Sequence, residues 1–119
     1  MSDDRLRQSM LLDFYGELLT DKQRECCELH FNEDLSLAEI AEQCGVSRQS
    51  VWDNIRRALA SMESIEERTG LIRRFEETRR ALGELETSAR RLISVCSGGE
   101  GEELARELLD GISALRVKG

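Results

Sequence analysis

The stretch SLAEIAEQCGVSRQSVWDNIRRAL, from Ser36 to Leu59, decides the fold of this chain. Ser36 precedes a run with apolar residues at helical spacing, so its side chain can cap a helix that ends near Cys44. Gly45 supplies the backbone freedom that a tight turn needs, because it has no side chain to clash at positive φ. Ser47 can cap a second helix, whose buried side consists of Val51, Ile55, Ala58 and Leu59. Two short helices joined through such a turn predict a helix-turn-helix.

The exposed positions of the second helix are where such a unit would contact DNA or another partner. Arg48 could pair bidentately with guanine and Gln49 with adenine. Trp52 should lie at least partly exposed, and the neighbouring Asp53 would be repelled by phosphate. These two residues favour a protein partner, although Trp52 could also lie flat over its own chain. The predicted contact set is Ser47, Arg48, Gln49, Trp52, Asp53, Arg56 and Arg57.

The composition predicts an all-α protein. Among its 119 residues, 39% are hydrophobic and 34% charged, and proline is absent. The formal net charge is -7, with -5 in residues 1–60 and -2 in residues 61–119. Phosphate neutralisation supplies most of the non-specific affinity for nucleic acid, so an acidic chain argues against strong autonomous DNA binding. The second helix of the motif is nevertheless locally basic.

The cysteines and the single histidine do not predict a metal site. The residues are Cys26, Cys27, Cys44, Cys96 and His30, and they lack metal-ligand spacing. Free thiols fit a reducing cytoplasm. Without an apolar run long enough for a signal peptide or a membrane span, we expect a cytoplasmic protein that does not insert into membranes.

No constellation of catalytic residues is apparent, so we expect a protein that is not an enzyme and needs no cofactor. The acidic neighbours Glu66 and Glu67 are expected on a helix surface, where burial rarely raises a carboxyl pKa for acid–base work. The glycine-rich segment 98–101 is followed by neither a strand nor a lysine, so it does not predict a phosphate-binding loop.

The remaining helices are placed by apolar periodicity and by caps. We expect a first helix over residues 4–18 and a second from the capping box that begins at Thr20 to about Phe31. With the helix-turn-helix, whose second helix continues to about Arg68, they form a domain of residues 1–68. A helical arm follows over residues 69–119.

The arm contains a heptad-like helix from Leu71 to Val95, a glycine-rich loop at 97–101 and a last helix from Glu102 to Arg116. The heptad stripe asks for another helix to cover it, either in an antiparallel hairpin or in a homodimer. The residues of this predicted oligomerisation stripe are Leu71, Phe75, Leu82, Leu85 and Leu92.

Three blocks of the sequence resemble the bacterial YlxM family. They are LLDFYGELLT at residues 11–20, KQRECCELHFNEDLSLAEIAEQCGVSRQSVWDNI at 22–55 and GLIRRF at 70–75. The resemblance covers roughly residues 5–80; beyond them only helical character is shared. The helix-turn-helix half also looks like the region-four domain of bacterial sigma factors, which reads promoter DNA.

The resemblance implies a helix-turn-helix regulator accessory to the signal recognition particle pathway. The implied partners are the GTPase Ffh, its receptor FtsY or the RNA of the particle, an association inferred largely from gene neighbourhood. A sequence-specific transcription regulator that binds DNA is the alternative hypothesis, and a structural module that dimerises through the arm is a third. Family members often carry tyrosine where this chain has Trp52, so an aromatic side chain is shared there.

Overall fold

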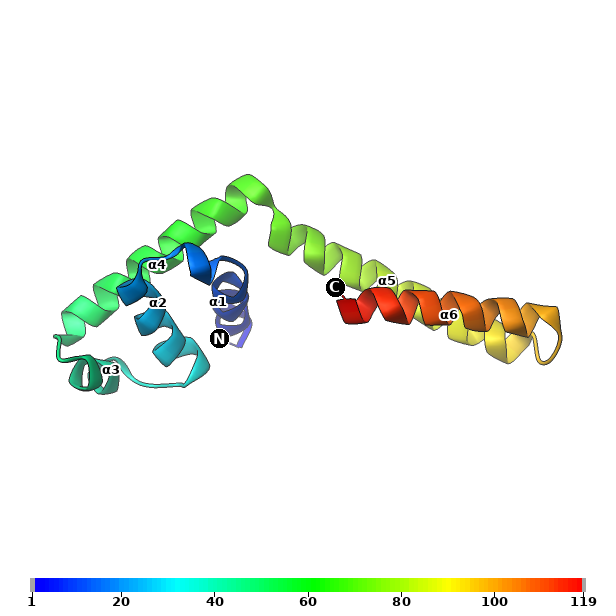
Figure 1. The fold of residues 1–119 in the computed structure, drawn as a ribbon, viewed down its shortest axis with the longest axis horizontal. Coiled ribbons are helices and arrows are strands. Elements are labelled where there is room, and N and C mark those ends of the chain that lie inside the picture. Colours follow the sequence, from blue (N-terminus) through cyan, green and yellow to red (C-terminus); the bar gives the residue numbers. More distant parts are fainter. Residues whose placement is uncertain (1, 119) are drawn as a thin grey trace. The chain divides into compact units, whose positions relative to one another are not determined.

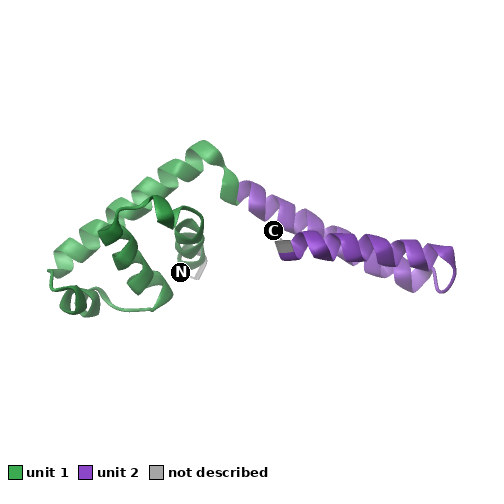
Figure 2. Ribbon diagram, viewed as in Figure 1, with its two compact units in different colours: residues 1–72 green, residues 73–119 purple. Residues whose placement is uncertain are grey.

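The computed structural model describes residues 2–118, and these residues form helices joined by short connections, without a β-strand (Figure 1). The chain is all-α, as its sequence predicts. It divides into two compact units, residues 1–72 (unit 1) and residues 73–119 (unit 2) (Figure 2). The elements in chain order are α1 (Ser2–Tyr15), the 3-10 helix η1 (Gly16–Leu18), α2 (Asp21–Cys27), the π-helix η2 (Glu28–Asn32), α3 (Leu37–Cys44), α4 (Arg48–Thr69), α5 (Leu71–Val95) and α6 (Glu100–Lys118).

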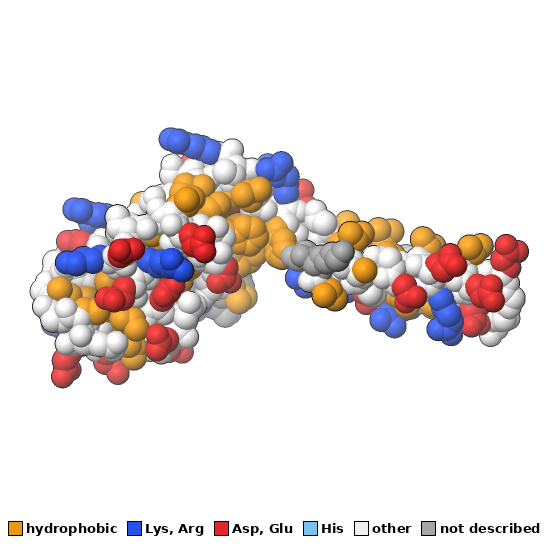
Figure 3. Space-filling model, in the orientation of Figure 1, with side chains coloured by type: hydrophobic (Ala, Val, Ile, Leu, Met, Phe, Trp, Pro, Cys, Tyr) orange, Lys and Arg blue, Asp and Glu red, His pale blue; other side chains and the backbone are white. Residues whose placement is uncertain are grey.

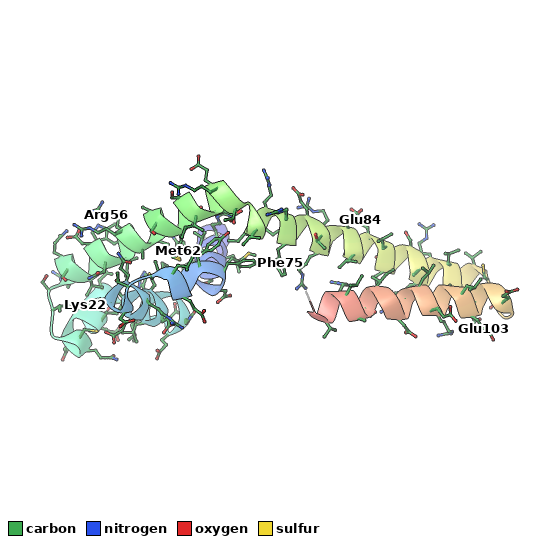
Figure 4. The ribbon with its side chains drawn as sticks, turned by 45° about the horizontal axis from the view of Figure 1, so that its top comes forward. Lys22, Arg56, Met62, Phe75, Glu84 and Glu103 are labelled. Atoms are coloured by element: carbon green, nitrogen blue, oxygen red, sulfur yellow. The ribbon has the colours of Figure 1, made fainter. Side chains whose placement is uncertain are left out.

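In unit 1, the long helix α4 packs against α1, α2 and α3. Its inner side carries apolar residues at helical spacing, and Met62 points from α4 toward this interior while Arg56 points away from it (Figure 4). The largest fully buried side chains of the unit are Leu11, Ile40, Ile55, Met62, Ile72, Val51 and Cys27.

Two segments differ from the helices that the sequence predicts. The first helix ends at Tyr15, and residues 16–18 tighten into η1, where the backbone N–H of Leu19 donates to the carbonyl of Gly16 (3.1 Å). The second α-helix ends at Cys27 and continues as η2, which closes with a bond from the Glu33 N–H to the Glu28 carbonyl (3.2 Å).

One expectation about a surface carboxylate is wrong. Glu66 is only 7% exposed, because its side chain points into unit 1 beneath the end of α4. Its Oε1 accepts a hydrogen bond from the Tyr15 hydroxyl (2.6 Å) and another from the backbone N–H of Ile72 (2.9 Å). The carboxyl group therefore connects α1, the end of α4 and the start of α5. Glu67, its neighbour, is exposed as expected.

In unit 2, α5 and α6 run antiparallel (Figures 1 and 2). We call residues 73–118, which include α5 from residue 73 onward, α6 and the loop between them, the hairpin. The helix α6 begins at Glu100, so the last two residues of the predicted loop at 97–101 belong to it. Acidic residues in its first turn favour this start, since they face the positive end of the helix dipole. The Glu102 carboxylate also accepts a bond from the Gly98 N–H (2.8 Å), which lowers its pKa.

The predicted oligomerisation stripe is divided. Phe75 and Leu82 are half-buried, whereas Leu71, Leu85 and Leu92 are exposed. The hairpin instead makes its contact around Ala89 of α5, which falls in the same heptad spacing as the stripe, and Ala105 of α6, and these two residues are buried. No helix among the described residues is long and apolar enough to cross a membrane.

Candidate functional site

Helices α3 and α4 form the helix-turn-helix through two serine caps and a glycine turn. The Ser36 hydroxyl accepts from the Glu39 N–H (3.1 Å), and the Glu39 carboxylate accepts from the Ser36 N–H (2.9 Å). This reciprocal capping box lowers the pKa of Glu39. Gly45 ends α3 in the left-handed region at φ 69° and ψ 34°, and the Ser47 hydroxyl caps α4 by accepting from the Ser50 N–H (3.0 Å).

The buried side of α4 fixes which of its residues face outward. Val51, Ile55 and Ala58 are at most 1% exposed and belong to the core of unit 1. The other side of the helix is turned to solvent. Of the predicted contact set, the exposed residues are Ser47, Arg48, Gln49, Trp52, Arg56 and Arg57.

Trp52 is 44% exposed. Together with Arg48 and Gln49 it forms one wall of an open groove of about 860 Å³. The opposite wall is the first turn of α3, with Ser36, Leu37 and Ala38. The sequence prediction missed this wall. The Ser36 cap predicts where α3 begins, but no local motif predicts which residues of α4 this first turn faces.

Asp53 differs from its predicted neighbours because it is half-buried and already bonded. Its carboxylate accepts from Gln49 Nε2 (3.2 Å) and lies 3.4 Å from the Arg56 guanidinium. These contacts offset part of the negative charge that would repel phosphate. A second, smaller depression lies on the other side of Gln49, lined by Ser47, Gln49, Ser50, Asp53, Asn54 and Arg57. Ser50 and Asn54 also escaped the sequence prediction.

The groove is lined by side chains that can contact a partner, among them a hydroxyl, an amide, a guanidinium and an indole. Among the residues that the structure describes, no group of three or more His, Cys, Asp or Glu side chains could hold a metal ion. His30 contacts the carbonyl of Leu35 through its Nδ1 (2.9 Å). Burial raises the pKa of the Cys27 thiol to about 12, and a hydrogen bond to Glu25 raises that of Cys44. These thiols are therefore poor nucleophiles at neutral pH.

The comparison with known proteins agrees with this geometry. Residues 2–95 match the family model described as "UPF0122: Putative helix-turn-helix protein, YlxM / p13 like". The chain belongs to this family. A UPF0122 protein of Shouchella clausii is 42% identical over 115 residues, which are 97% of this chain and 99% of the relative. A UPF0122 protein of Geobacillus kaustophilus is 44% identical over 110 residues, which are 91% of this chain and 96% of the relative.

A UPF0122 protein of Thermoanaerobacter sp. strain X514 is 51% identical over 77 residues. That match covers 65% of this chain and 66%, just under two thirds, of the relative. The UPF0122 family is thus the YlxM family that the three sequence blocks resemble, and the helix-turn-helix of unit 1 fits the description of its model.

Proposed function

We propose that this UPF0122 protein is a non-catalytic regulatory protein accessory to the signal recognition particle pathway. It binds Ffh or FtsY through the recognition face, defined as the groove between the first turn of α3 and residues Arg48, Gln49 and Trp52 of α4. Membership of the YlxM family supports the pathway, since an association with Ffh and FtsY is what the resemblance implies. The observation that supports binding through this face is the exposed side chain of Trp52.

A tryptophan beside an arginine is typical of the energetic centre of a protein–protein interface. Trp52 lies 44% exposed on a rigid helix, next to the groove that Ser36 and Arg48 help to line. Its large surface gains most when a partner removes it from water. The recognition face therefore has an apolar anchor, a cation and an amide, which suit a folded protein surface.

The charge of unit 1 also favours a protein partner over a nucleic acid. Residues 1–72 hold eight basic and fifteen acidic residues, a net of -7, whereas residues 73–119 hold nine of each. The net negative charge of the chain thus lies in the unit that carries the recognition face, because the charges of unit 2 sum to zero. Affinity for nucleic acid rises with the number of phosphates that basic side chains neutralise. The few arginines of α4 can do this, whereas the acidic residues of unit 1 repel phosphate.

Binding of the full chain to purified Ffh and to purified FtsY tests this function. The emission of Trp52, the only tryptophan, reports binding directly. We expect micromolar or tighter affinity, and a loss of about tenfold or more in Trp52→Ala measured by calorimetry, because interface tryptophans commonly cost 2 kcal/mol or more when truncated. Leu18→Ala is the control, since Leu18 is 69% exposed but does not line the groove.

Absence of binding to Ffh, FtsY and the particle RNA alike would reject the pathway. Binding to the RNA alone would retain the pathway but reject the protein partner. An equal loss in Trp52→Ala and Leu18→Ala would reject the recognition face.

Sequence-specific DNA binding is the second candidate function, and one observation favours it. Arg48 and Gln49 are exposed in the first turn of α4, the part of a recognition helix that reads base edges in the major groove. Selection from random duplex DNA at low salt should then return a shared site. Arg48→Ala should cost about 1–3 kcal/mol at one base pair. Arg68→Ala, in the last turn of the same helix, is the control.

A further inference from the structure

Two small residues lie at the centre of the hairpin contact in unit 2. Ala89 and Ala105 are 3% and 2% exposed, and no other apolar residue of the described hairpin is fully buried. The larger apolar residues next to them along the contact are half-buried, namely Leu82, Ile93, Leu109 and Ile112. Near the loop, Gly101 lies against the side chain of Cys96. Other large apolar residues, turned further from this line, are left uncovered.

Five of these large residues lie on one side of the hairpin, which we call the apolar side. At 100° per residue, they are turned about 40 to 100° in the same sense from Ala89 in α5 and from Ala105 in α6. In an antiparallel pair, equal turns from the contact line lead to the same face. Figure 3 shows hydrophobic side chains on the surface along the hairpin. The residues are Leu85, Leu92, Leu104, Leu108 and Leu115, which are 45–58% exposed.

The opposite side of the hairpin is polar and closed by ion pairs. Glu86 of α5 binds Arg116 of α6 (2.8 Å) and Arg90 of its own helix (3.5 Å), and the bond to Arg116 lowers the pKa of Glu86. Glu102 binds Arg106 (3.1 Å). Unit 2 is therefore an amphipathic layer of two helices, and such a layer is stable when a second layer covers its apolar side.

The charge along the hairpin is divided between its two ends. The open end, residues 73–83 and 108–118, holds six basic and three acidic residues, a net of +3. The loop end, residues 84–107, holds three basic and six acidic residues, a net of -3. Figure 4 shows Glu103 at this end. A surface of this kind is complementary to a reversed copy of itself.

We infer that a second copy of this chain covers the apolar side, in a four-helix bundle whose loop end lies against the partner's open end. A two-fold axis across the hairpin brings the leucines of both copies together and places each acidic end on a basic one. A partner with a single charge sign would match only half of this surface. The inference is independent of the proposed function, because it uses only residues of unit 2.

Light scattering on the full chain measures the assembly. We expect twice the 13.5 kDa chain mass. The variant with both Leu85→Glu and Leu108→Glu should be monomeric, with a dissociation constant raised at least a hundredfold, because burying four uncompensated carboxylates in the bundle is costly. Leu18→Glu makes the same change at an exposed leucine outside the hairpin and should remain dimeric.

Circular dichroism of each variant checks that the hairpin keeps its helices. If the double glutamate variant loses helicity, the milder pair Leu92→Ala and Leu104→Ala replaces it, with at least a tenfold rise expected in the dissociation constant. A wild-type chain that stays monomeric at about 100 µM would overturn the inference. So would a helical double variant that still dimerises like wild type.

Charge reversal tests the orientation of the two copies. Glu100→Lys with Glu107→Lys, both at the edge of α6 next to the apolar side, should raise the dissociation constant about tenfold at low salt, because the loop end would then meet a basic open end. Adding Arg73→Glu and Arg74→Glu, at the corresponding edge of α5, should restore the wild-type dissociation constant. In a parallel bundle the acidic loop ends would face each other, so the first pair would relieve their repulsion and lower the dissociation constant, which would refute the antiparallel arrangement. Glu33→Lys with Glu42→Lys changes the net charge equally in unit 1 and is the control.

Discussion

At the scale of single residues, Tyr15 and Glu66 make the most consequential contact that the sequence did not reveal. Glu66 has the helical spacing of the buried residues Ile55 and Met62 along α4. Because it is charged, the sequence predicts that it lies on the helix surface. Its main partner is 51 residues away. Periodicity within a helix cannot identify such a pair, because the burial of a carboxyl group depends on donors supplied by other elements.

Tyr15→Phe should lower the free energy of unfolding by about 1–2 kcal/mol, because it removes a donor from the buried Glu66 and a contact with Thr69 (2.7 Å). Urea denaturation at pH 8 measures this loss. Glu66→Gln keeps an acceptor for the Ile72 N–H and is the milder comparison. Equal stabilities of Tyr15→Phe and wild type would show that the bond adds nothing.

The same tyrosine makes stability depend on alkaline pH. Burial, and next to it the bond to Glu66, raises the pKa of Tyr15 above its ordinary value of 10.0. The contribution of Tyr15 to the free energy of unfolding is therefore complete below pH 10. It is lost as the pH rises above 10, because the tyrosine hydroxyl ionises at a lower pH in the unfolded chain than in the folded one. The free energy of unfolding should therefore fall more steeply above pH 10 in wild type than in Tyr15→Phe. Parallel curves would contradict this prediction.

The four thiols should react in an order set by burial. Cys27 is fully buried with a pKa of about 12, and burial also raises the pKa of Cys26. Cys44 and Cys96 are both half-buried, and the hydrogen bond to Glu25 raises the pKa of the Cys44 thiol. In the native protein at pH 7.5, we expect iodoacetamide to modify Cys96 first and Cys27 last, measured by peptide mass spectrometry. Guanidinium should abolish the difference, and early modification of Cys27 would contradict its burial.

At the scale of elements, the sequence predicted where helices begin better than it predicted which type of helix forms. Thr20, Ser36 and Ser47 cap α2, α3 and α4 as expected, because a cap is a local interaction between residues three apart. The sequence did not predict that the first helix tightens into the 3-10 helix η1, or that the second continues as the π-helix η2. Both changes arise where the chain turns between packed helices, as in the bond of the Leu35 N–H to the Leu29 carbonyl (3.0 Å), and no local motif specifies them.

The same substitution should have opposite effects at two glycines. Gly45→Ala should destabilise unit 1 by about 1–2 kcal/mol, because φ 69° is strained for alanine even though no atom lies within 4 Å of its side chain. Gly83→Ala should stabilise the helical hairpin by about 0.5–1 kcal/mol, since Gly83 lies inside α5 with similar open space. Thermal unfolding followed by circular dichroism compares the two variants. Destabilisation by both would mean that Gly83 has a role other than that of a weak helix former.

At the scale of the whole molecule, the heptad pattern predicted a surface that requires a partner but not the side on which it lies. Sequence spacing assigned Leu85 and Leu92 to one stripe with Ala89. In the hairpin, Ala89 makes the internal contact and the two leucines remain exposed. Which member of a stripe is used depends on how closely the second helix approaches, and small residues decide that distance.

The recognition face and the apolar side lie in different units, so their functions should be separable. The monomeric variant with Leu85→Glu and Leu108→Glu should bind a single Ffh or FtsY molecule with an affinity within about twofold of wild type, because distant sites contribute independently. Trp52→Ala should instead lose partner binding and remain dimeric. Titration followed by Trp52 emission measures the first affinity, and light scattering measures the second variant. If the monomeric variant lost partner binding while its helicity stayed intact, the partner would have to contact both copies, and the dimer would itself be the functional unit.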